Sequence, residues 1–321
     1  MTVDLQRWRN TAPQAAPLLS IVVPYKDYPV AALAQELIGQ AEQQSLPVEL
    51  VFADDGSSEH KHAADLRQHF ERAAIACTLL VSSRNLGRAA IRNRLAQEAR
   101  GPYLLFLDAD MLPDSDDFLR RYLEHALQGK LDIVCGGRSY LRLTSCREDR
   151  RLYRYFSQVT ECVGAGVRNR HPLWYLLTNN LMVRRSLLLE QPYNERYHGW
   201  GFEDADWALR LRHARALHID NTASHMDLPS EQEMLEKFDD SRANFARIRR
   251  DVPEFRRLAV HRAASLLVWQ PVPSRWLRWM TRRLALARWL PMRVRFLSVQ
   301  GYRAATYTAV LRAEMLGHPL R

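Results

Sequence analysis

The stretch LLFLDADMLPDSDDF, Leu104 to Phe118, joins a strongly apolar run to two carboxylates one residue apart. Residues 103–107 have the length and composition of a buried strand, and Asp108 and Asp110 follow at its end. Two negative charges at such a place are costly unless they are compensated. They lie either in a solvated turn that leads into the next helix, or beside a divalent cation such as Mg²⁺ or Mn²⁺, which takes carboxylate and phosphate oxygens as ligands.

Strand-like and helix-like segments alternate through the first part of the chain. Apolar runs at residues 19–23, 49–53, 77–81 and 103–107 predict strands, and helices are predicted at residues 31–41, 59–73 and 86–99 and after a cap at Ser115. This alternation predicts a parallel sheet with helices on both faces. Ligands bind such sheets beyond the carboxyl ends of the strands. Polar residues follow all four strands, so we expect the strand ends to converge on one site; these residues are Tyr25-Lys26-Asp27, Asp54-Asp55, Arg84-Asn85 and Asp108-Ala109-Asp110.

The alternation fades in the second part of the chain. The change comes after residues 132–136. Short strands are predicted at residues 178–183 and 216–219, and the loop GWGFEDADW at Gly199–Trp207 leads into a helix. From Ser230 the pattern becomes helical, with a proline-containing break at residues 270–276. We therefore expect an α/β domain followed by a helical extension.

The positive charge of the chain is concentrated near its end. Net charge is +10, and residues 229–321 carry 18 Lys and Arg against 8 Asp and Glu. Twelve arginines and no acid lie between Glu254 and Glu314, interspersed with Trp269, Trp276, Trp279 and Trp289. Such asymmetry indicates an anionic partner. Two interpretations stay open: an interfacial helix with arginines at lipid headgroups and tryptophans at the acyl boundary, or a helical subdomain that packs its tryptophans on the core.

Several classes of protein are disfavoured by the sequence. Cys77, Cys135, Cys146 and Cys162 lie far apart without a CxxC or Cys/His cluster, which argues against a zinc site or a disulfide framework. The N-terminal segment lacks the apolar core of a secretory signal, and no run reaches the ~18 uncharged apolar residues that a membrane span needs. We expect a cytoplasmic protein with reduced thiols that contacts the inner face of the cell membrane.

Six segments, in this order, resemble the inverting family two of GT-A-fold glycosyltransferases: SIVVPYKDY (20–28), DDGSSE (54–59), RNLGRAAIRN (84–93), LLFLDAD (104–110), TNNLMVRRSL (178–187) and GWGFEDADW (199–207). The resemblance implies the GT-A fold, an α/β nucleotide-diphospho-sugar transferase fold with a Rossmann-like mixed sheet. It places an arm at residues 1–17 and a catalytic domain at 18–228, with a nucleotide-sugar half (18–110) and an acceptor half (111–228). Residues 229–321 form the C-terminal helical extension, which the resemblance does not cover.

The resemblance also implies site residues. Asp110 would ligate the metal as part of a DxD motif, with His225 as a second protein ligand, and Asp108 would lie near the ribose or a metal-bound water. The alternative interpretation is that His225 is a residue of a surface loop. His218, which lies inside a predicted strand, is a weaker candidate for the metal ligand. The remaining donor-site residues would be Pro24, Tyr25, Asp54 and Asp55 at uracil and ribose, Arg84, Asn85, Gly87 and Arg92 in the rest of the nucleotide pocket, and Asn180 as a further substrate contact.

The segment GWGFEDADW also resembles the GWGxED segment of β-1,4-galactosyltransferases. By that resemblance Asp204 is the base that accepts the acceptor's proton, Glu203 contacts a sugar, and Trp200 and Gly201 form a sugar platform. The N-terminal dipole of the following helix favours ionised carboxylates, as a base requires. The alternative is that Glu203, Asp204 and Asp206 are ordinary acids of a first helical turn.

The sequence therefore predicts a glycosyltransferase that uses Mn²⁺ or Mg²⁺. It would transfer a hexose or N-acetylhexosamine from a UDP-sugar, with inversion, to a hydroxyl of a glycan acceptor that is free or linked to a lipid diphosphate. A nucleotidyltransferase would usually show a glycine-rich phosphate loop after its first strand, where this chain has PYKDYPV. An arginine-rich nucleic-acid binder is the other alternative, but no known nucleic-acid-binding motif occurs, so we expect no nucleic-acid partner.

Overall fold

The computed structural model describes residues 5–13, 16–59 and 61–317, and their contacts divide the chain into two compact units. Unit 1 comprises Met1–Thr144, Glu161–Glu195 and Leu211–Asp227. Unit 2 comprises Ser145–Thr160, Arg196–Arg210 and Leu228–Arg321. Two stretches before residue 228 thus belong to the same unit as the C-terminal helices. The functional halves that we expected within residues 18–228 stay a prediction.

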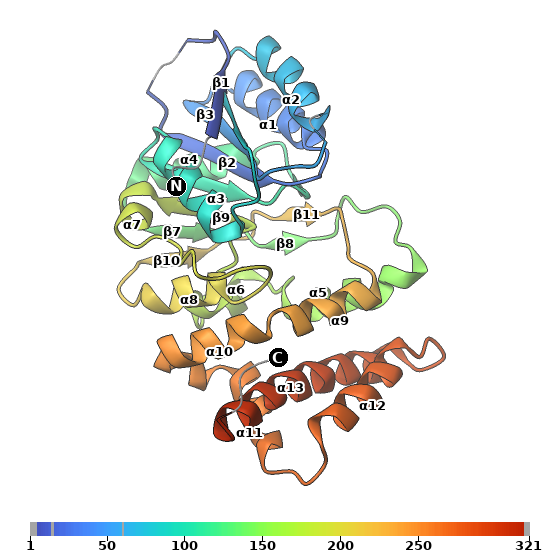
Figure 1. Ribbon diagram of the computed structural model, residues 1–321. Coiled ribbons are helices and arrows are strands. Elements are labelled where there is room, and N and C mark those ends of the chain that lie inside the picture. Colours follow the sequence, from blue (N-terminus) through green and yellow to red (C-terminus); the bar gives the residue numbers. More distant parts are fainter. Residues whose placement is uncertain (1–4, 14–15, 60, 318–321) are drawn as a thin grey trace. The chain divides into compact units, whose positions relative to one another are not determined.

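Unit 1 is built on a mixed sheet of eight strands in the order β1-β4-β3-β2-β5-β9-β7-β10 (Figure 1). Strands β2, β3, β4 and β5 run parallel, as the alternating pattern predicts, whereas β1 pairs antiparallel with β4 and β9 pairs antiparallel with both β5 and β7. Strand β10 is parallel to β7. The strands are β1 (Leu5–Arg9), β2 (Leu19–Tyr25), β3 (Val48–Asp54), β4 (Ala76–Ser82), β5 (Tyr103–Leu107), β7 (Ile133–Cys135), β9 (Asn180–Arg184) and β10 (Ala216–His218).

Helices cover both faces of this sheet because its strands are apolar on both sides. Ile21 and Val23 of β2 pack in one core with apolar residues of α1, α2 and α4, and α3 packs beside α7. The helices of unit 1 are α1 (Ala31–Gln43), α2 (Lys61–Arg72), α3 (Arg88–Glu98), α4 (Phe118–Gln128), α6 (Ala165–Arg168) and α7 (Arg185–Glu190), with a 3-10 turn η2 at Pro172–Tyr175.

A second sheet has three strands, and its first strand, β6, comes directly after β5 in the chain. Strand β11 (Ala223–His225) lies between β6 (Met111–Pro113), with which it is antiparallel, and β8 (Arg138–Ser139), with which it is parallel. Asp114 fastens the three strands, because its carboxylate accepts hydrogen bonds from the hydroxyls of Ser139, Thr222 and Ser224. The residues after β5 are thereby tied to a segment more than a hundred residues later in the chain.

Most elements predicted from periodicity are confirmed, including the first four parallel strands and the helices between them. Two features differ. Residues 5–9, which we placed in an N-terminal arm, form the edge strand β1 of the large sheet. The helix expected from a cap at Ser115 begins at Phe118, because the Ser115 carbonyl accepts the Phe118 amide in a turn before the helix.

Unit 2 is helical and is held by two apolar cores. In one, Phe245 of α10 stacks on Tyr307 of α13 with ring centroids 4.3 Å apart, and in the other Leu152 of α5, Phe238 of α9 and Tyr302 of α13 come together. The elements of this unit are η1 (Glu148–Arg150), α5 (Arg151–Thr160), α8 (Glu203–Arg210), α9 (Glu231–Asp240), α10 (Arg242–Asp251), η3 (Pro253–Arg257), α11 (Ala259–Val268), α12 (Ser274–Leu286) and α13 (Met292–Met315).

The basic segment forms a helical subdomain, whereas its tryptophans are largely exposed. Helices α11, α12 and α13 do pack together and against α9 and α10, as the subdomain interpretation requires. Of the tryptophans, Trp269 and Trp289 are each 81% exposed, and Trp276 and Trp279 are 56% and 54% exposed. Among the residues that the structure describes, no helix combines the length and the apolar character needed to cross a bilayer.

His218, the weaker metal candidate, is part of the scaffold of unit 1. Its Nδ1 lies 2.7 Å from Nη1 of Arg168 and its Nε2 lies 2.9 Å from the carbonyl oxygen of Pro172. Since arginine can only donate, Nδ1 accepts and Nε2–H donates, which is the neutral form of the ring. Burial lowers the pKa of His218 to about 4, and the nearby Arg168 charge acts in the same direction.

This arrangement predicts that acid destabilises the protein through His218. Between pH 6.5 and about 4, His218 is protonated in the unfolded chain but stays neutral in the folded chain. The free energy of unfolding therefore falls as pH falls, by on the order of 3 kcal/mol over this range. We expect His218→Gln to flatten this dependence in urea unfolding measured from pH 7 to 4.5. The exposed His213, changed to Gln, is the control. Parallel curves for His218→Gln and the parent would contradict the prediction.

Candidate active site

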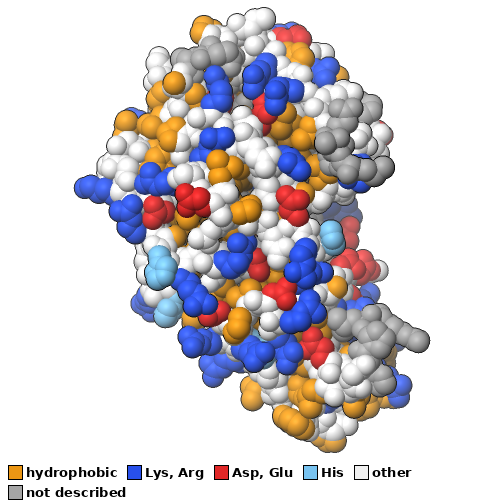
Figure 2. Space-filling view, turned by 60° about the vertical axis from the view of Figure 1, so that its left-hand side comes forward, with side chains coloured by type: hydrophobic (Ala, Val, Ile, Leu, Met, Phe, Trp, Pro, Cys, Tyr) orange, Lys and Arg blue, Asp and Glu red, His pale blue; other side chains and the backbone are white. Residues whose placement is uncertain are grey.

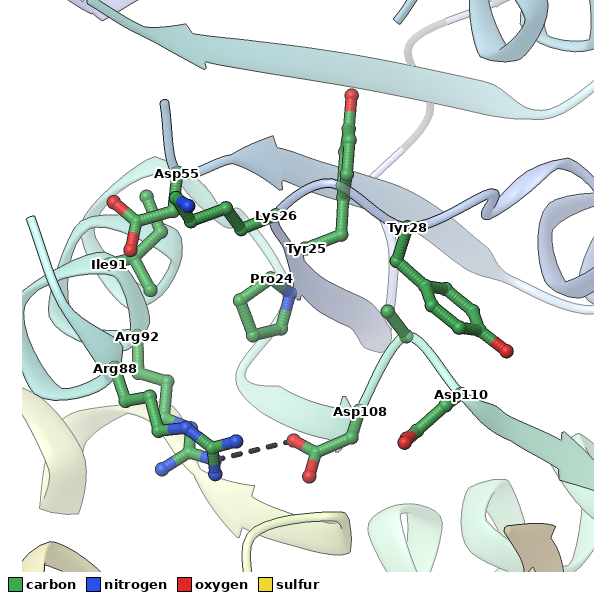
Figure 3. Close-up of a pocket in the computed structure, with 11 residues that line it drawn as sticks. Pro24, Tyr25, Lys26, Tyr28, Asp55, Arg88, Ile91, Arg92, Asp108 and Asp110 are labelled. Carbon is green, nitrogen blue, oxygen red and sulfur yellow. Dashed lines mark hydrogen bonds and ion pairs between the residues drawn. The ribbon is translucent and has the colours of Figure 1, made fainter. Parts of the chain in front are cut away.

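The ends of β2, β3 and β5 and one face of α3 enclose a pocket of about 240 Å³ in unit 1 (Figure 3). Six residues predicted from the sequence line it: Pro24, Tyr25, Asp55, Arg92, Asp108 and Asp110. Five further residues complete the lining: Lys26, Tyr28, Arg88, Ile91 and Ala109. The convergence of strand ends is therefore found for three of the four expected strands.

Asp108 is paired with a buried arginine. Arg92 Nη2 lies 3.3 Å from Asp108 Oδ1, and the arginine side chain is only 2% exposed. Its guanidinium also lies over the ring of Tyr193, 5.7 Å from the centroid. Figure 3 shows Arg88 projecting toward the same carboxylate from one turn earlier in α3. The spacing of four residues in RNLGRAAIRN is the signal that would have placed Arg88 beside Arg92.

Asp110 is paired with His225, as the resemblance implied. His225 Nε2 and Asp110 Oδ2 are 2.8 Å apart, and the Met226 amide donates to the Asp110 carbonyl. The antiparallel pairing of β6 and β11 sets this contact, because it places His225 opposite Met111. Burial alone would raise the pKa of Asp110, but the hydrogen bond and charge of His225, with Arg138 and Arg88 nearby, hold that pKa below its ordinary value. The carboxylate is therefore ionised at neutral pH.

Tyr28 also lies near Asp110 in the pocket (Figure 3). Burial raises the pKa of Tyr28 to about 12, and the negative charges of Asp110 and Asp227 add to that shift. Its hydroxyl therefore remains protonated and can donate a hydrogen bond to an anionic ligand. The sequence offered no signal for this residue beyond its place in the opening segment.

Asp55 holds the loop that follows β4. Its two carboxylate oxygens accept the backbone amides of Leu86, at 2.6 Å, and Gly87, at 3.0 Å. Burial raises the pKa of Asp55, and these two amides oppose that shift. Gly56 has φ +71°, and a Cβ on it would lie 2.4 Å from the backbone carbon of Arg84, so only glycine fits between the two loops. The DDG turn and the loop at residues 84–87 thus form one unit.

Four predicted donor-site residues do not line the pocket: Asp54, Arg84, Asn85 and Gly87. Asp54 is 1% exposed, and its Oδ1 accepts the Ser57 amide, so it shapes the turn that positions Asp55. Asn180 also differs from the expected substrate contact. Its Oδ1 accepts the Tyr122 hydroxyl, and its Nδ2 donates to the carbonyls of Gly137 and Asn221. These bonds tie β9 to the loops after β7 and β10 and leave the side chain 1% exposed.

The family model described as glycosyl transferase family 2 matches residues 20–190, which include every strand end of this pocket. The chain belongs to glycosyl transferase family 2. A curated relative, the uncharacterized glycosyltransferase EpsJ of Bacillus subtilis (strain 168), is 33% identical over 124 residues. That alignment covers 37% of this chain and 34% of EpsJ, so the chain matches about a third of the relative's length.

A solved mannosyltransferase structure shares the fold. The mannosyltransferase PcManGT from Pyrobaculum calidifontis, in complex with GDP-Man and Mn²⁺, superposes with a TM-score of 0.57 at 18% identity, over 94% of this chain and 88% of PcManGT. TarS 1-349 of S. aureus gives a TM-score of 0.48 at 14% identity, over 94% of this chain and 93% of that chain. The PcManGT superposition confirms the expected GT-A fold with C-terminal helices. Membership of glycosyl transferase family 2 supports a glycosyltransferase over the nucleotidyltransferase alternative.

The second candidate segment of this glycosyltransferase, Gly199–Trp207, lies in unit 2. Three residues of its backbone have a positive φ: Gly199 (+70°), Gly201 (+97°) and Phe202 (+72°). Phe202 is strained in this conformation, and its ring packs edge-on against Phe245, Phe255 and Tyr307. Glu203 and Asp204 then begin α8, with Glu203 buried and Asp204 partly exposed.

Asn244 of α10 holds this loop, a role that sequence reasoning missed. Its Nδ2 lies 2.8 Å from the carbonyl oxygen of His198 and 3.0 Å from that of Gly201. The carbonyl of Trp200 is a longer third contact, while the Trp200 ring packs against Phe238. A side-chain amide that gathers several carbonyls from one loop fixes the loop's backbone, and hence the start of α8.

Asn244→Ala is therefore expected to loosen the segment that carries Asp204. Without the Asn244 amide, the carbonyls of His198 and Gly201 lose their hydrogen-bond donor. This loss should lower the free energy of unfolding by about 1–3 kcal/mol. Backbone amides of residues 199–204 should exchange hydrogen faster, while those of β2 and β3 in unit 1 stay protected. Gln232→Ala on the exposed surface of α9 is the control. Unchanged exchange in residues 199–204 would show that Asn244 does not hold the loop.

Proposed function

We propose that this glycosyltransferase transfers a hexose or N-acetylhexosamine from a UDP-sugar to a glycan hydroxyl, with inversion at the anomeric carbon. The observation that carries the proposal is the paired Asp110 and His225 at the end of β5, beside a pocket lined by Tyr25, Asp55 and Arg88. Family membership supports a nucleotide-sugar donor. The nucleobase and the sugar rest on the resemblance of the individual segments.

Asp110 and His225 would hold Mn²⁺ or Mg²⁺. An ionised carboxylate and an imidazole nitrogen 2.8 Å apart are both suitable donors, and a bound cation would replace the proton between them. Within residues 5–13, 16–59 and 61–317, no group of three or more His, Cys, Asp or Glu side chains forms a closed metal site. A site with two protein ligands leaves positions for diphosphate oxygens and water. When bound, the ion supplies charge neutralisation at the diphosphate leaving group.

The remaining pocket residues would bind and orient the donor. Pro24, Tyr25 and Asp55 lie where the resemblance places uracil and ribose, and the Asp55 carboxylate is held by two backbone amides. Arg88 brings a positive charge to the pocket and would meet the diphosphate. Arg92 would keep Asp108 oriented rather than contact the donor itself, because it is buried against that carboxylate.

Asp204 would act as the base that accepts the proton of the acceptor hydroxyl, and Glu203 would contact a sugar. Both stand in the first turn of α8, an eight-residue helix whose N-terminal dipole favours the ionised form. Removal of that proton as the acceptor oxygen attacks the anomeric carbon gives inversion by direct displacement. We further propose that the acceptor glycan is carried on a lipid diphosphate and that the enzyme works at the cytoplasmic face of the membrane.

Asp204→Asn tests the base. The amide keeps the shape of the side chain and cannot accept the proton, so we expect transfer to fall by about 10²-fold or more while the Kd for UDP stays within about twofold. Transfer is measured by product formation, and UDP binding by calorimetry with Mn²⁺. Asp240→Asn, at the exposed end of α9, is the matched control and should keep full activity. Equal activity of Asp204→Asn and the parent would remove Asp204 from the mechanism.

Asp110→Ala tests the metal site without relying on turnover. We expect this variant to lose the stabilisation that UDP and Mn²⁺ together give the parent in thermal unfolding, because the bridge between protein and diphosphate is gone. Asp116→Ala, an exposed aspartate six residues later, should behave like the parent. If Mn²⁺ enhances UDP binding equally in Asp110→Ala and the parent, the assignment is wrong. A panel of UDP-sugars with GDP-mannose, scored by donor hydrolysis, tests the nucleobase; hydrolysis of GDP-mannose alone would contradict uracil.

A further inference from the structure

A group of large apolar side chains in unit 2 faces solvent. On α12, Trp276, Trp279 and Met280 lie at helical spacing on one face and are 45–56% exposed, while Ala285 on the opposite face is buried. The preceding turn and the end of α11 add Leu266, Trp269 and Val272, of which Leu266 is 75% and Trp269 81% exposed. These six residues are called the tryptophan face. Figure 2 shows hydrophobic side chains gathered at the lower end of the view, over the α11–α12 turn.

The tryptophan face is held in place by the hydrogen bonds of one partly buried arginine. Arg312 of α13 donates to the backbone carbonyls of Leu267, Val268, Gln270 and Val272, all in or beside the α11–α12 turn, and to the Ser274 hydroxyl. Trp276 and Trp279 also pack edge-on, with ring centroids 6.0 Å apart. One arginine thus fixes the turn that carries Trp269. A turn braced in this way presents its apolar side chains to solvent as a stable surface.

Positive charge surrounds the tryptophan face. Arg275 and Arg283 lie exposed on the same helix, and the Arg283 guanidinium lies over the Trp279 ring, 5.2 Å from its centroid. No acid occurs between Glu254 and Glu314. Two other arginines of the segment are neutralised by acids of α9, since Arg278 pairs with Asp239 and Arg295 with Glu231. The arginines beside the tryptophans therefore leave an excess of positive charge on this surface.

We propose that the tryptophan face binds the surface of a bilayer that contains anionic lipids. Tryptophan rings settle at the boundary between headgroups and acyl chains, and arginines beside them meet the lipid phosphates. The charge selects this occupant over a second copy of the chain, because a symmetric contact through the same face would bring arginines against arginines. A cationic partner would find no acidic residue on this face with which to form an ion pair.

Membrane binding through this face rests on the proposed function and extends it, because a lipid-linked acceptor lies in the bilayer. An enzyme bound to the bilayer surface would meet such an acceptor there. Its test is separate from that function. Binding to vesicles is measured without donor, acceptor or metal, so a failure of Asp204 or Asp110 in the assays above leaves the vesicle result unchanged. The absence of vesicle binding would equally leave those catalytic assignments standing.

The test is co-sedimentation of the full chain with vesicles of phosphatidylcholine alone or mixed with phosphatidylglycerol. We expect binding to the mixed vesicles that weakens at about 0.5 M salt, and a blue shift of tryptophan fluorescence. Trp269→Ser combined with Trp276→Ser should weaken binding by roughly tenfold or more. Arg275→Gln combined with Arg283→Gln should weaken it by roughly thirtyfold.

Matched controls come from exposed residues of unit 1. Trp174→Ser with Leu141→Ser, and Arg120→Gln with Arg170→Gln, should bind vesicles as the parent does. All variants should keep the parent's thermal midpoint within a few degrees, which excludes unfolding as the cause of any loss. No binding, equal binding to neutral vesicles, or equal losses in the controls would overturn the proposal. A tryptophan variant that changes only the sedimentation coefficient of the free protein would identify a second copy as the occupant.

Discussion

The contact between the Asp110 carboxylate and the His225 imidazole is the constraint on which the site depends. The two residues are 115 positions apart and only 2.8 Å from each other. Backbone pairing of β6 with β11 brings them together, and Asp114 locks that pairing by accepting hydrogen bonds from three hydroxyls of the small sheet. A carboxylate at the end of a buried strand thus has a partner before any ligand arrives, which offsets part of the cost of burying its charge.

The other carboxylates at the pocket, Asp108 and Asp55, are stabilised in different ways. These differences decide how far the negative charge of each carboxylate is compensated by the protein. Asp108 faces the buried Arg92, so its charge is balanced inside the protein. Asp55 is bound by two backbone amides, which fix its orientation without cancelling its charge. Asp110 is the one of these three that is paired with an imidazole, a group that can exchange its proton for a cation. This difference supports the proposal that Asp110, rather than Asp108, is the metal ligand.

In unit 2, a buried asparagine supports the strained backbone, and a partly buried arginine supports the exposed apolar surface. Phe202 keeps a left-handed backbone because its ring is enclosed by three aromatic rings, and Asn244 gathers the carbonyls of the same loop. Arg312 does the same for the α11–α12 turn that carries Trp269. Conformations that are unfavourable in isolation persist where the surrounding structure supports them from several directions, and such places are often functional.

The sequence by itself determined the four parallel strands with the helices between them, the polar residues at the ends of those strands and the family, because hydrophobic periodicity and short motifs are local properties of a chain. Only the tertiary structure decided which of those polar side chains reach the pocket. Asp54 and Asn180 make their hydrogen bonds with the scaffold, whereas Arg88 and Tyr28, which lie in two of the motifs but were given no role there, line the pocket. It also decided that Leu5–Arg9 completes the sheet and that the tryptophans of α12 face outward. These outcomes depend on contacts between residues far apart in the chain. A polar side chain makes a limited number of hydrogen bonds, and the neighbours that the fold brings to it decide whether any remain for a ligand.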